Sequence, residues 1–169
     1  MHKKREPWLP FFVCAMDYQA KLYTPFSVLG IRCTEVSLTG IDFLPGDEET
    51  KAPVNAFAGH VCKELRCYLE YPLHVFSIPV DPAGTLYQKK VWQALLAIPV
   101  RQTKSYGELA AELASGAQAV GQACGANPIP IVIPCHRVLG KAGLGGFMKH
   151  AGGAPLDIKR WLLAHERAA

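Results

Sequence analysis

The chain has 169 residues, of which 50% are hydrophobic and 19% are charged, a composition typical of a globular protein with one large or two small domains. No stretch is long and apolar enough to span a bilayer, and the short apolar run near the N-terminus lacks a good cleavage site, so we expect neither a membrane helix nor a secretory signal. The six cysteines form no Cys-x-x-Cys pair, which favours reduced intracellular thiols over a disulfide framework or a metal centre.

The net charge of +4 is unevenly distributed along the chain. Residues 1–82 carry 8 Lys and Arg against 10 Asp and Glu, a balance of −2, whereas residues 83–169 carry 10 against 4, a balance of +6. A basic half attracts a polyanion, so the second half is the part that we expect to contact nucleic acid transiently.

The first half of the chain predicts a small antiparallel sheet with one helix packed on it. Short β-branched and aromatic runs separated by turn signals predict strands at residues 22–23, 30–34, 37–44 and 75–80. Apolar residues at helical spacing predict an amphipathic helix over residues 55–70. The sequence Asp-Pro-Ala-Gly at residues 81–84 is the expected linker, which divides the chain into domains at 1–82 and 83–169.

The second half predicts short helices. Thr85 can cap a helix that ends at residues 98–99, and Ser105 with Glu108 has the spacing of a capping box for a helix that stops near residue 115. Residues 117–125 form a slim, uncharged helix of small residues, which with the preceding helix suggests a helix-turn-helix. Such a helix either approaches a narrow groove closely or is simply buried, and the sequence favours neither. A last helix is expected from Asp157 to His165.

One cysteine stands in a distinctive setting. Cys135 follows an apolar, proline-rich run (127–134) that predicts a rigid extended strand, and it directly precedes His136 and Arg137. A thiol is nucleophilic only as thiolate, and a cationic neighbour or a nearby base favours that form. The local chemistry leaves two interpretations open, a reactive cysteine and a buried structural one.

Several motifs in residues 85–166 resemble the O6-alkylguanine–DNA alkyltransferase family, single-turnover repair proteins that move an alkyl group from guanine to their own cysteine. The motifs are Thr103-Lys104-Ser105-Tyr106, Ala119-Val120-Gly121, Asn127-Pro128, Ile133-Pro134-Cys135-His136-Arg137-Val138, Gly145-Gly146-Phe147 and Trp161-Leu162-Leu163-Ala164-His165-Glu166. The first 80 residues match only weakly. The resemblance implies an α+β fold with an N-terminal small antiparallel sheet and packed helix (ribonuclease H-like), and a C-terminal, mainly helical, winged helix-turn-helix-like domain.

The resemblance also implies the catalytic residues. Cys135 would be the alkyl acceptor, His136 the base that acts on the thiol through a bridging water, and Glu166 the residue that orients His136. Tyr106 would donate a proton toward the leaving guanine and press on the target phosphate. Asn127 would be the hinge between the recognition helix and the active-site strand.

Further residues would contact DNA or the damaged base. By resemblance they are Ser105, Gln118, Ala119, Gly121, Arg137, Gly145, Gly146, Phe147, Met148 and Lys159. Arg137 matches a motif position of structural character, and the segment 145–148 would wall the alkyl pocket. The family binds the minor groove through the helix-turn-helix and flips the damaged nucleotide out of the stack. Small residues let the slim helix lie in a groove only about 6 Å wide.

The sequence departs from the family pattern in several places. Gln118 stands where the family usually has an arginine that inserts into the base stack, so extrusion or affinity is expected to be weaker. Residues 100–102 replace a glycine-containing turn, and residues 149–155 lengthen the pocket loop. Ser37 and Asp42 stand where some relatives carry zinc ligands, so we expect no structural zinc, and no cofactor is implied.

These observations lead to one main hypothesis and two alternatives. The first is a monomeric, stoichiometric dealkylase that acts on O6-alkylguanine, and also on O4-alkylthymine, in double-stranded DNA, located with the nucleoid in a prokaryotic cytoplasm or in a eukaryotic nucleus. The second is a non-enzymatic sensor of alkylated DNA, although such sensors lack the acceptor cysteine. The third, a cysteine hydrolase or thiol-redox protein, fits the bare Cys-His pair but predicts turnover.

Overall fold

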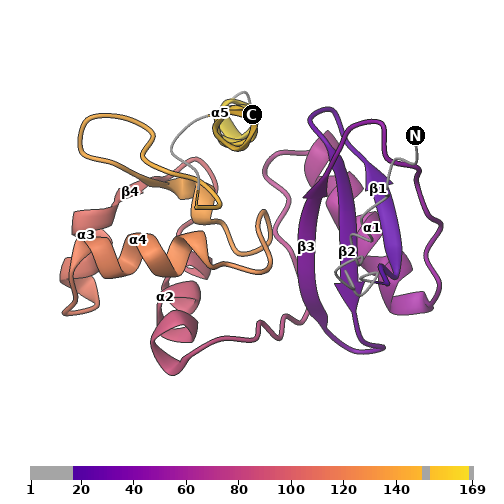
Figure 1. The fold of residues 1–169 in the computed structure, drawn as a ribbon, viewed down its shortest axis with the longest axis horizontal. Helices are drawn as coiled ribbons and strands as arrows, with labels where there is room; N and C mark the ends of the chain where they lie inside the picture. Colours follow the sequence, from indigo (N-terminus) through magenta and orange to yellow (C-terminus); the bar gives the residue numbers. More distant parts are fainter. Residues whose placement is uncertain (1–16, 150–152, 168–169) are drawn as a thin grey trace, which may run out of the picture.

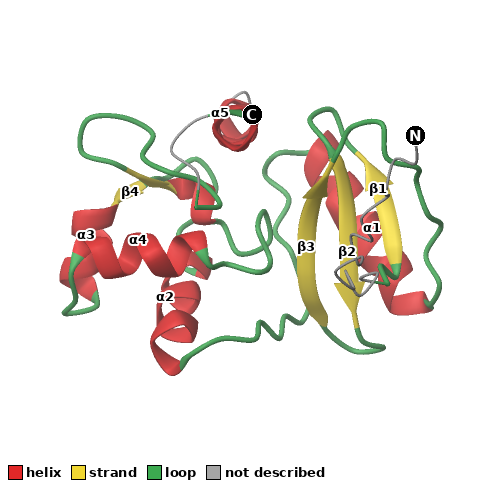
Figure 2. Ribbon diagram, in the orientation of Figure 1, coloured by secondary structure: helices red, strands yellow, loops and turns green. Residues whose placement is uncertain are grey.

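A computed structural model describes residues 17–149 and 153–167. The expectations for the apolar run near the N-terminus, for Cys14 and for part of the lengthened loop fall outside these residues. Figure 1 shows two parts side by side, a sheet with its helix and a cluster of helices, with α5 (Ala154–Arg167) lying between them at one end. Figure 2 shows the long coil that joins the two parts after α1, where the expected boundary near residue 82 lies; that boundary stays a prediction.

The sheet has three antiparallel strands in the order β1 (Ala20–Tyr23), β2 (Val28–Cys33) and β3 (Leu38–Leu44). The helix α1 (Ala56–Glu70) packs on it through buried apolar residues such as Val61 and Leu65, as the helical spacing predicted. Asn55 caps this helix, because its side chain accepts a hydrogen bond from the backbone N–H of Ala58 at 2.8 Å. The α+β class predicted for the chain is confirmed.

The strand predicted at residues 75–80 is wrong. This segment is coil and meets the sheet through one parallel bridge, between Val80 and Leu38, with the Leu38 N–H donating to the Pro79 carbonyl at 2.9 Å. Pro79 has no N–H to give to a ladder, and the Val75 side chain is 78% exposed instead of facing the core. The β-branched and aromatic composition had indicated a strand, but the segment pairs with the sheet only at its end, around Val80.

The helical part follows its local signals closely. Helix α2 (Leu86–Leu96) begins after a capping box made by Thr85 and Gln88, and α3 (Tyr106–Glu112) begins after the predicted box of Ser105 and Glu108. Helix α4 (Ala117–Gly125) packs against both. Arg101 adopts a left-handed conformation, φ 70°, in the turn where the family resemblance led us to expect glycine.

Two very short parallel strands connect the helix-turn-helix to the cysteine motif. They are β4 (Lys104–Ser105), directly before α3, and β5 (Val138–Leu139), directly after the 3-10 turn η1 (Cys135–Arg137). Because the two strands pair, the start of α3 and the cysteine are held at a fixed separation. One face of α4 is buried through Val120, Ala123 and Cys124, as the second interpretation expected. The other face is open, and its approach to a groove stays a prediction.

The extended strand predicted before Cys135 is also wrong. Residues 128–133 form turns and bends; Ile131 has φ 75°, and the Ile133 N–H donates to the Ile129 carbonyl at 2.9 Å. Asn127 holds this fold, since its side-chain amide donates to the Ile133 carbonyl at 2.8 Å and its oxygen accepts from the Ile129 N–H at 3.0 Å. The prolines remove backbone donors, so the segment turns around one buried amide instead of joining a sheet.

Candidate active site

Cys135 lies at the base of a pocket of about 690 Å³. Its side chain is 3% exposed, and it is the first residue of η1, directly after the turn that Asn127 organises. The lining residues come from α2, α3, α4 and the loop after β5: Gln88, Tyr106, Gln118, Gly121, Gln122, Cys124, Gly125, Ala126, Cys135, Gly146, Phe147, Met148 and Lys149. The volume is suited to a flat, drug-sized group such as a nucleobase.

Burial controls the chemistry of the Cys135 thiol. Desolvation raises the pKa of Cys135, and the hydrogen bond with Asn127 and the positive charge of Lys159 offset this only in part. The guanidinium of Arg137, two residues further along the chain, instead donates hydrogen bonds to Glu166 and to the Ile98 carbonyl. The resting side chain is therefore a neutral thiol at neutral pH, and it needs a base to become a nucleophile.

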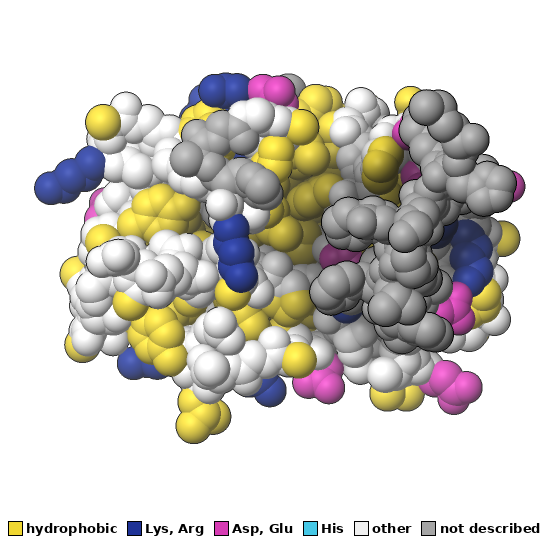
Figure 3. Space-filling model, in the orientation of Figure 1, with side chains coloured by type: hydrophobic (Ala, Val, Ile, Leu, Met, Phe, Trp, Pro, Cys, Tyr) yellow, Lys and Arg dark blue, Asp and Glu magenta, His cyan; other side chains and the backbone are white. Residues whose placement is uncertain are grey.

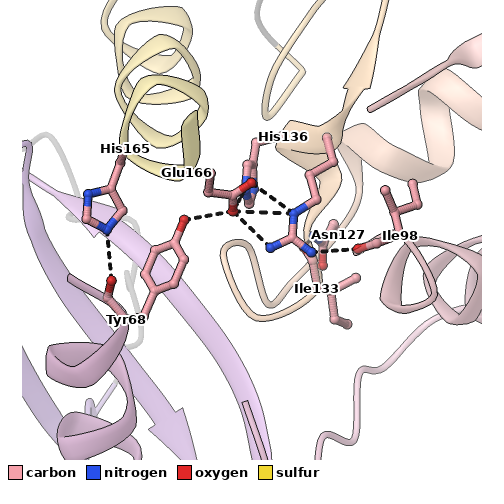
Figure 4. Close-up of polar contacts among 8 residues, drawn as sticks. Tyr68, Ile98, Asn127, Ile133, His136, His165 and Glu166 are labelled. Carbon is pink, nitrogen blue, oxygen red and sulfur yellow. Dashed lines mark hydrogen bonds and ion pairs between the residues drawn. The ribbon is translucent and has the colours of Figure 1, made fainter. Parts of the chain in front are cut away.

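Figure 4 shows a polar network centred on the carboxylate of Glu166 at the end of α5. His136 Nε2 lies 2.7 Å from Glu166 Oε1, and Arg137 donates to Glu166 from Nη2 at 2.9 Å and from Nε at 3.1 Å. Arg137 Nη1 also donates to the Ile98 carbonyl at 2.6 Å. The hydroxyl of Tyr68, on α1 in the sheet part, donates to the same Oε1 at 2.9 Å.

The network determines the protonation state of its members. Burial by itself would raise the pKa of Glu166, but hydrogen bonds from His136 and Arg137 outweigh it and hold that pKa at about 2. Burial lowers the pKa of His136 in spite of the adjacent carboxylate, so the imidazole is neutral at pH 7. An ionised carboxylate at Nε2 requires the proton on that nitrogen, which leaves Nδ1 with a lone pair. Nδ1 is buried and has no hydrogen-bond partner among the described residues.

The wall of the pocket is fastened by a buried lysine. Lys159 Nζ donates to the carbonyls of Val138, Leu144 and Gly146 at 2.7, 2.6 and 2.9 Å, and burial lowers the pKa of Lys159 to about 8. The Tyr106 hydroxyl also donates to the Gly146 carbonyl, at 3.3 Å. The loop that was expected to wall the alkyl pocket is therefore tied to α5 and β5 through Lys159 and to α3 through Tyr106.

The predicted substrate contacts divide into two groups. Those that line the pocket with Cys135 are Tyr106, Gln118, Gly121, Gly146, Phe147 and Met148. Those absent from the lining are Ser105, Ala119, Arg137, Gly145 and Lys159. Ser105 caps α3, and Gly145, with φ 68°, packs so closely on Tyr106 that a Cβ would lie 2.8 Å from its ring.

Sequence reasoning missed Tyr68 and several residues that line the pocket. Tyr68 lies in the half of the chain that matches the family weakly, and it reaches Glu166 only through the tertiary fold. Cys124, which had been counted among the free thiols, lines the same pocket as Cys135, as do Gln88 and Lys149.

Within residues 17–149 and 153–167, no group of three or more His, Cys, Asp or Glu side chains could hold a metal ion. No helix in this part of the chain is long and apolar enough to cross a membrane.

Fold and site together define a helix-turn-helix protein with a buried cysteine at the base of a pocket and a neutral, carboxylate-paired histidine next to it in sequence. A family model described as "6-O-methylguanine DNA methyltransferase, DNA binding domain" matches residues 86–168. The chain is 35% identical to a methylated-DNA–protein-cysteine methyltransferase of Methanosarcina acetivorans over 157 residues, 88% of this chain and 97% of the relative. It is 47% identical to the corresponding protein of Mycolicibacterium paratuberculosis over 115 residues, 66% of each chain.

Solved structures point to the same family as these sequence relatives. The chain is similar to the O6-methylguanine methyltransferase of Mycobacterium tuberculosis, with a TM-score of 0.74 and 37% identity over 88% of this chain and 91% of that one. A structure of that protein in complex with DNA matches with 38% identity and the same TM-score. The chain belongs to the methylated-DNA–protein-cysteine methyltransferase family, the O6-methylguanine–DNA methyltransferases that repair alkylated DNA. The predicted family, enzyme class and DNA partner are confirmed.

Proposed function

We propose that this protein takes the alkyl group from O6-alkylguanine, and also from O4-alkylthymine, onto the sulfur of Cys135, once per molecule. The single observation that carries this proposal is the pairing of a buried thiol at the base of the pocket with His136, whose unprotonated Nδ1 has no partner among the described residues. A neutral thiol needs a base, and the adjacent neutral imidazole is that base.

The Cys135 sulfur first gives up its proton and then takes the alkyl group. A water molecule relays the thiol proton to His136 Nδ1, and the ionised Glu166 stabilises the imidazolium that forms. The thiolate then attacks the alkyl carbon, so that an S–C bond forms as the C–O6 bond breaks. Burial raises the pKa of Tyr106, which keeps its hydroxyl protonated and able to donate toward the leaving guanine. A thioether does not hydrolyse, so Cys135 is used only once.

The damaged base must leave the helix to reach Cys135, because the thiol lies at the base of a pocket and the attacked carbon is inaccessible within a duplex. The open face of α4 consists of small and uncharged residues, which suits close approach to a minor groove about 6 Å wide. We infer that a monomer binds duplex DNA in this way. The protein would then work where chromosomal DNA is, with the nucleoid in a prokaryotic cytoplasm or in a eukaryotic nucleus.

A titration with excess substrate tests the proposal against its alternatives. The protein is incubated with a molar excess of duplex containing O6-methylguanine, and the restored guanine is counted per protein molecule. One guanine per molecule, abolished by Cys135→Ala, is the expected result. No restored guanine with DNA binding retained would instead identify a sensor of alkylated DNA, and more than one per molecule would identify a turning-over hydrolase or redox enzyme.

A further inference from the structure

The helix-turn-helix of this protein has almost no positive charge of its own. Residues 106–125, which contain α3 and α4, include no Lys or Arg but two glutamates, Glu108 and Glu112. Lys104, directly before α3, is paired with Glu112 at 2.7 Å. Figure 3 shows a face on which Lys and Arg side chains are sparse over α3 and α4, where uncharged and hydrophobic atoms dominate. Phosphate contacts supply much of the affinity for DNA, so the cations must come from elsewhere.

One residue that lines the pocket is a cation. Among residues 17–149 and 153–167, the lining contains three glutamines, Gln88, Gln118 and Gln122, and one basic residue, Lys149. The Lys149 side chain is exposed, and within the described part of the chain its amine takes part in no hydrogen bond or ion pair. An unpaired ammonium group at the mouth of a pocket attracts an anion in that position.

The backbone places Lys149 there. Met148 and Lys149 both have left-handed conformations, with φ of 50° and 66°, which non-glycine residues rarely adopt. Lys149 packs against the C-terminal end of α4, where a Cβ on Gly125 would lie 3.0 Å from Lys149 Cγ and 3.4 Å from its backbone nitrogen. Gly125 thus permits the close contact, and the negative end of the α4 dipole favours a cation beside it.

We propose that Lys149 binds a backbone phosphate next to the flipped nucleotide and supplies the cationic contact that α4 lacks. This inference rests on the proposed function. When the damaged base occupies the pocket, its sugar and phosphates stay at the mouth, where Lys149 lies. Lysine binds a phosphate as a point charge, without the planar geometry that arginine imposes, so a flexible side chain on a loop is sufficient.

The salt dependence of binding tests this role. Binding of an O6-methylguanine duplex is measured between 50 and 200 mM salt in a Cys135→Ala background, in which no substrate is consumed. Each phosphate contact contributes about 0.9 to the slope of log K against log salt. Raising the salt from 50 to 200 mM should therefore weaken DNA binding by a factor that is about 3.5 times smaller for Lys149→Gln than for its parent. Lys149→Arg should keep the parent slope. The matched control is Lys63→Gln, an exposed lysine on α1 that should also keep it.

Two outcomes would overturn the assignment of Lys149: a parental slope in Lys149→Gln, or a slope lowered equally in Lys149→Arg, which keeps the charge. Peptide mapping of the unsubstituted protein separates this failure from failure of the proposed function. If Cys135 is methylated while the Lys149→Gln slope is parental, only the role of Lys149 is refuted. If Cys135 stays unmethylated, the proposed function fails and the inference falls with it.

Discussion

Replacing Tyr68 with phenylalanine removes one donor from the buried Glu166 carboxylate and leaves the aromatic ring in place. The Tyr68 hydroxyl lies 2.9 Å from Glu166 Oε1 and joins α1 of the sheet part to the active site. The Tyr68 side chain is 1% exposed, so water does not replace the lost donor. Glu166 keeps its bonds to His136 and Arg137, so the change isolates a single contact between the two parts of the fold.

The magnitude follows from the kind of bond that is lost. A buried hydrogen bond to a charged group contributes about 1.5–3 kcal/mol, and the phenylalanine leaves no unsatisfied atom of its own. For a chain of this length, 1 kcal/mol shifts the melting temperature by about 2–4 °C. We therefore expect Tyr68→Phe to melt about 4–8 °C below the parent, on the basis of a loss of about 2 kcal/mol.

Thermal unfolding followed by circular dichroism measures this loss, with Tyr71→Phe as the matched control. Tyr71 follows the same helix, but its side chain is 66% exposed, so removal of its hydroxyl should change stability by less than about 0.5 kcal/mol. With one donor fewer, the Glu166 pKa should rise, which moves acid unfolding of Tyr68→Phe to higher pH. Equal melting temperatures for the two variants would refute the view that α1 stabilises the active-site carboxylate.

Three further predictions concern the site. The folded protein holds the pKa of Glu166 at about 2, below its ordinary value of 4.5, so this group contributes about 3 kcal/mol of stability above pH 4.5 that should be lost as the pH falls to 2. Urea unfolding at a series of pH values measures the loss, and an equally steep loss in Glu166→Gln would contradict the prediction. Gly145→Ala forces a Cβ against the Tyr106 ring at φ 68°, so it should lower stability by about 1–3 kcal/mol and slow methyl transfer. The control Gly143→Ala, where a Cβ has nothing within 4 Å, should do neither. Similar melting temperatures and transfer rates for the two variants would contradict this role of Gly145. Gln118→Arg should raise DNA affinity or the rate of repair, and no change in either would show that other residues hold the gap left by the flipped base.

Local signals in the sequence predicted local structure well. The capping pair of Ser105 and Glu108 and the helical spacing of α1 depend on residues three or four apart, so the sequence alone predicts these two helices. The two wrong strands, at 75–80 and before Cys135, failed for a shared reason: apolar and β-branched composition indicates burial, but proline removes the donors that a ladder requires.

The chemistry of the site was predictable only where motifs carried it. Cys135, His136 and Glu166 were expected together by resemblance, and the structure places them together. The Tyr68 contact joins residues 98 apart in sequence, and no periodicity or spacing signals such a pair. The protonation state of Cys135 was also beyond the sequence, because it depends on burial, which outweighs the basic neighbours that the motif shows.

The location of the transferred group tests the central claim most directly. Cys124 lines the same pocket as Cys135, and burial raises its pKa to about 12, so proximity to the alkyl group does not by itself identify the acceptor. The protein is reacted with duplex DNA containing O6-methylguanine and mapped by peptide mass spectrometry. We predict one methyl group per molecule, on the peptide that contains Cys135, and none in Cys135→Ala. A methyl group on Cys124, or an unmodified protein that still binds the duplex, would contradict the mechanism.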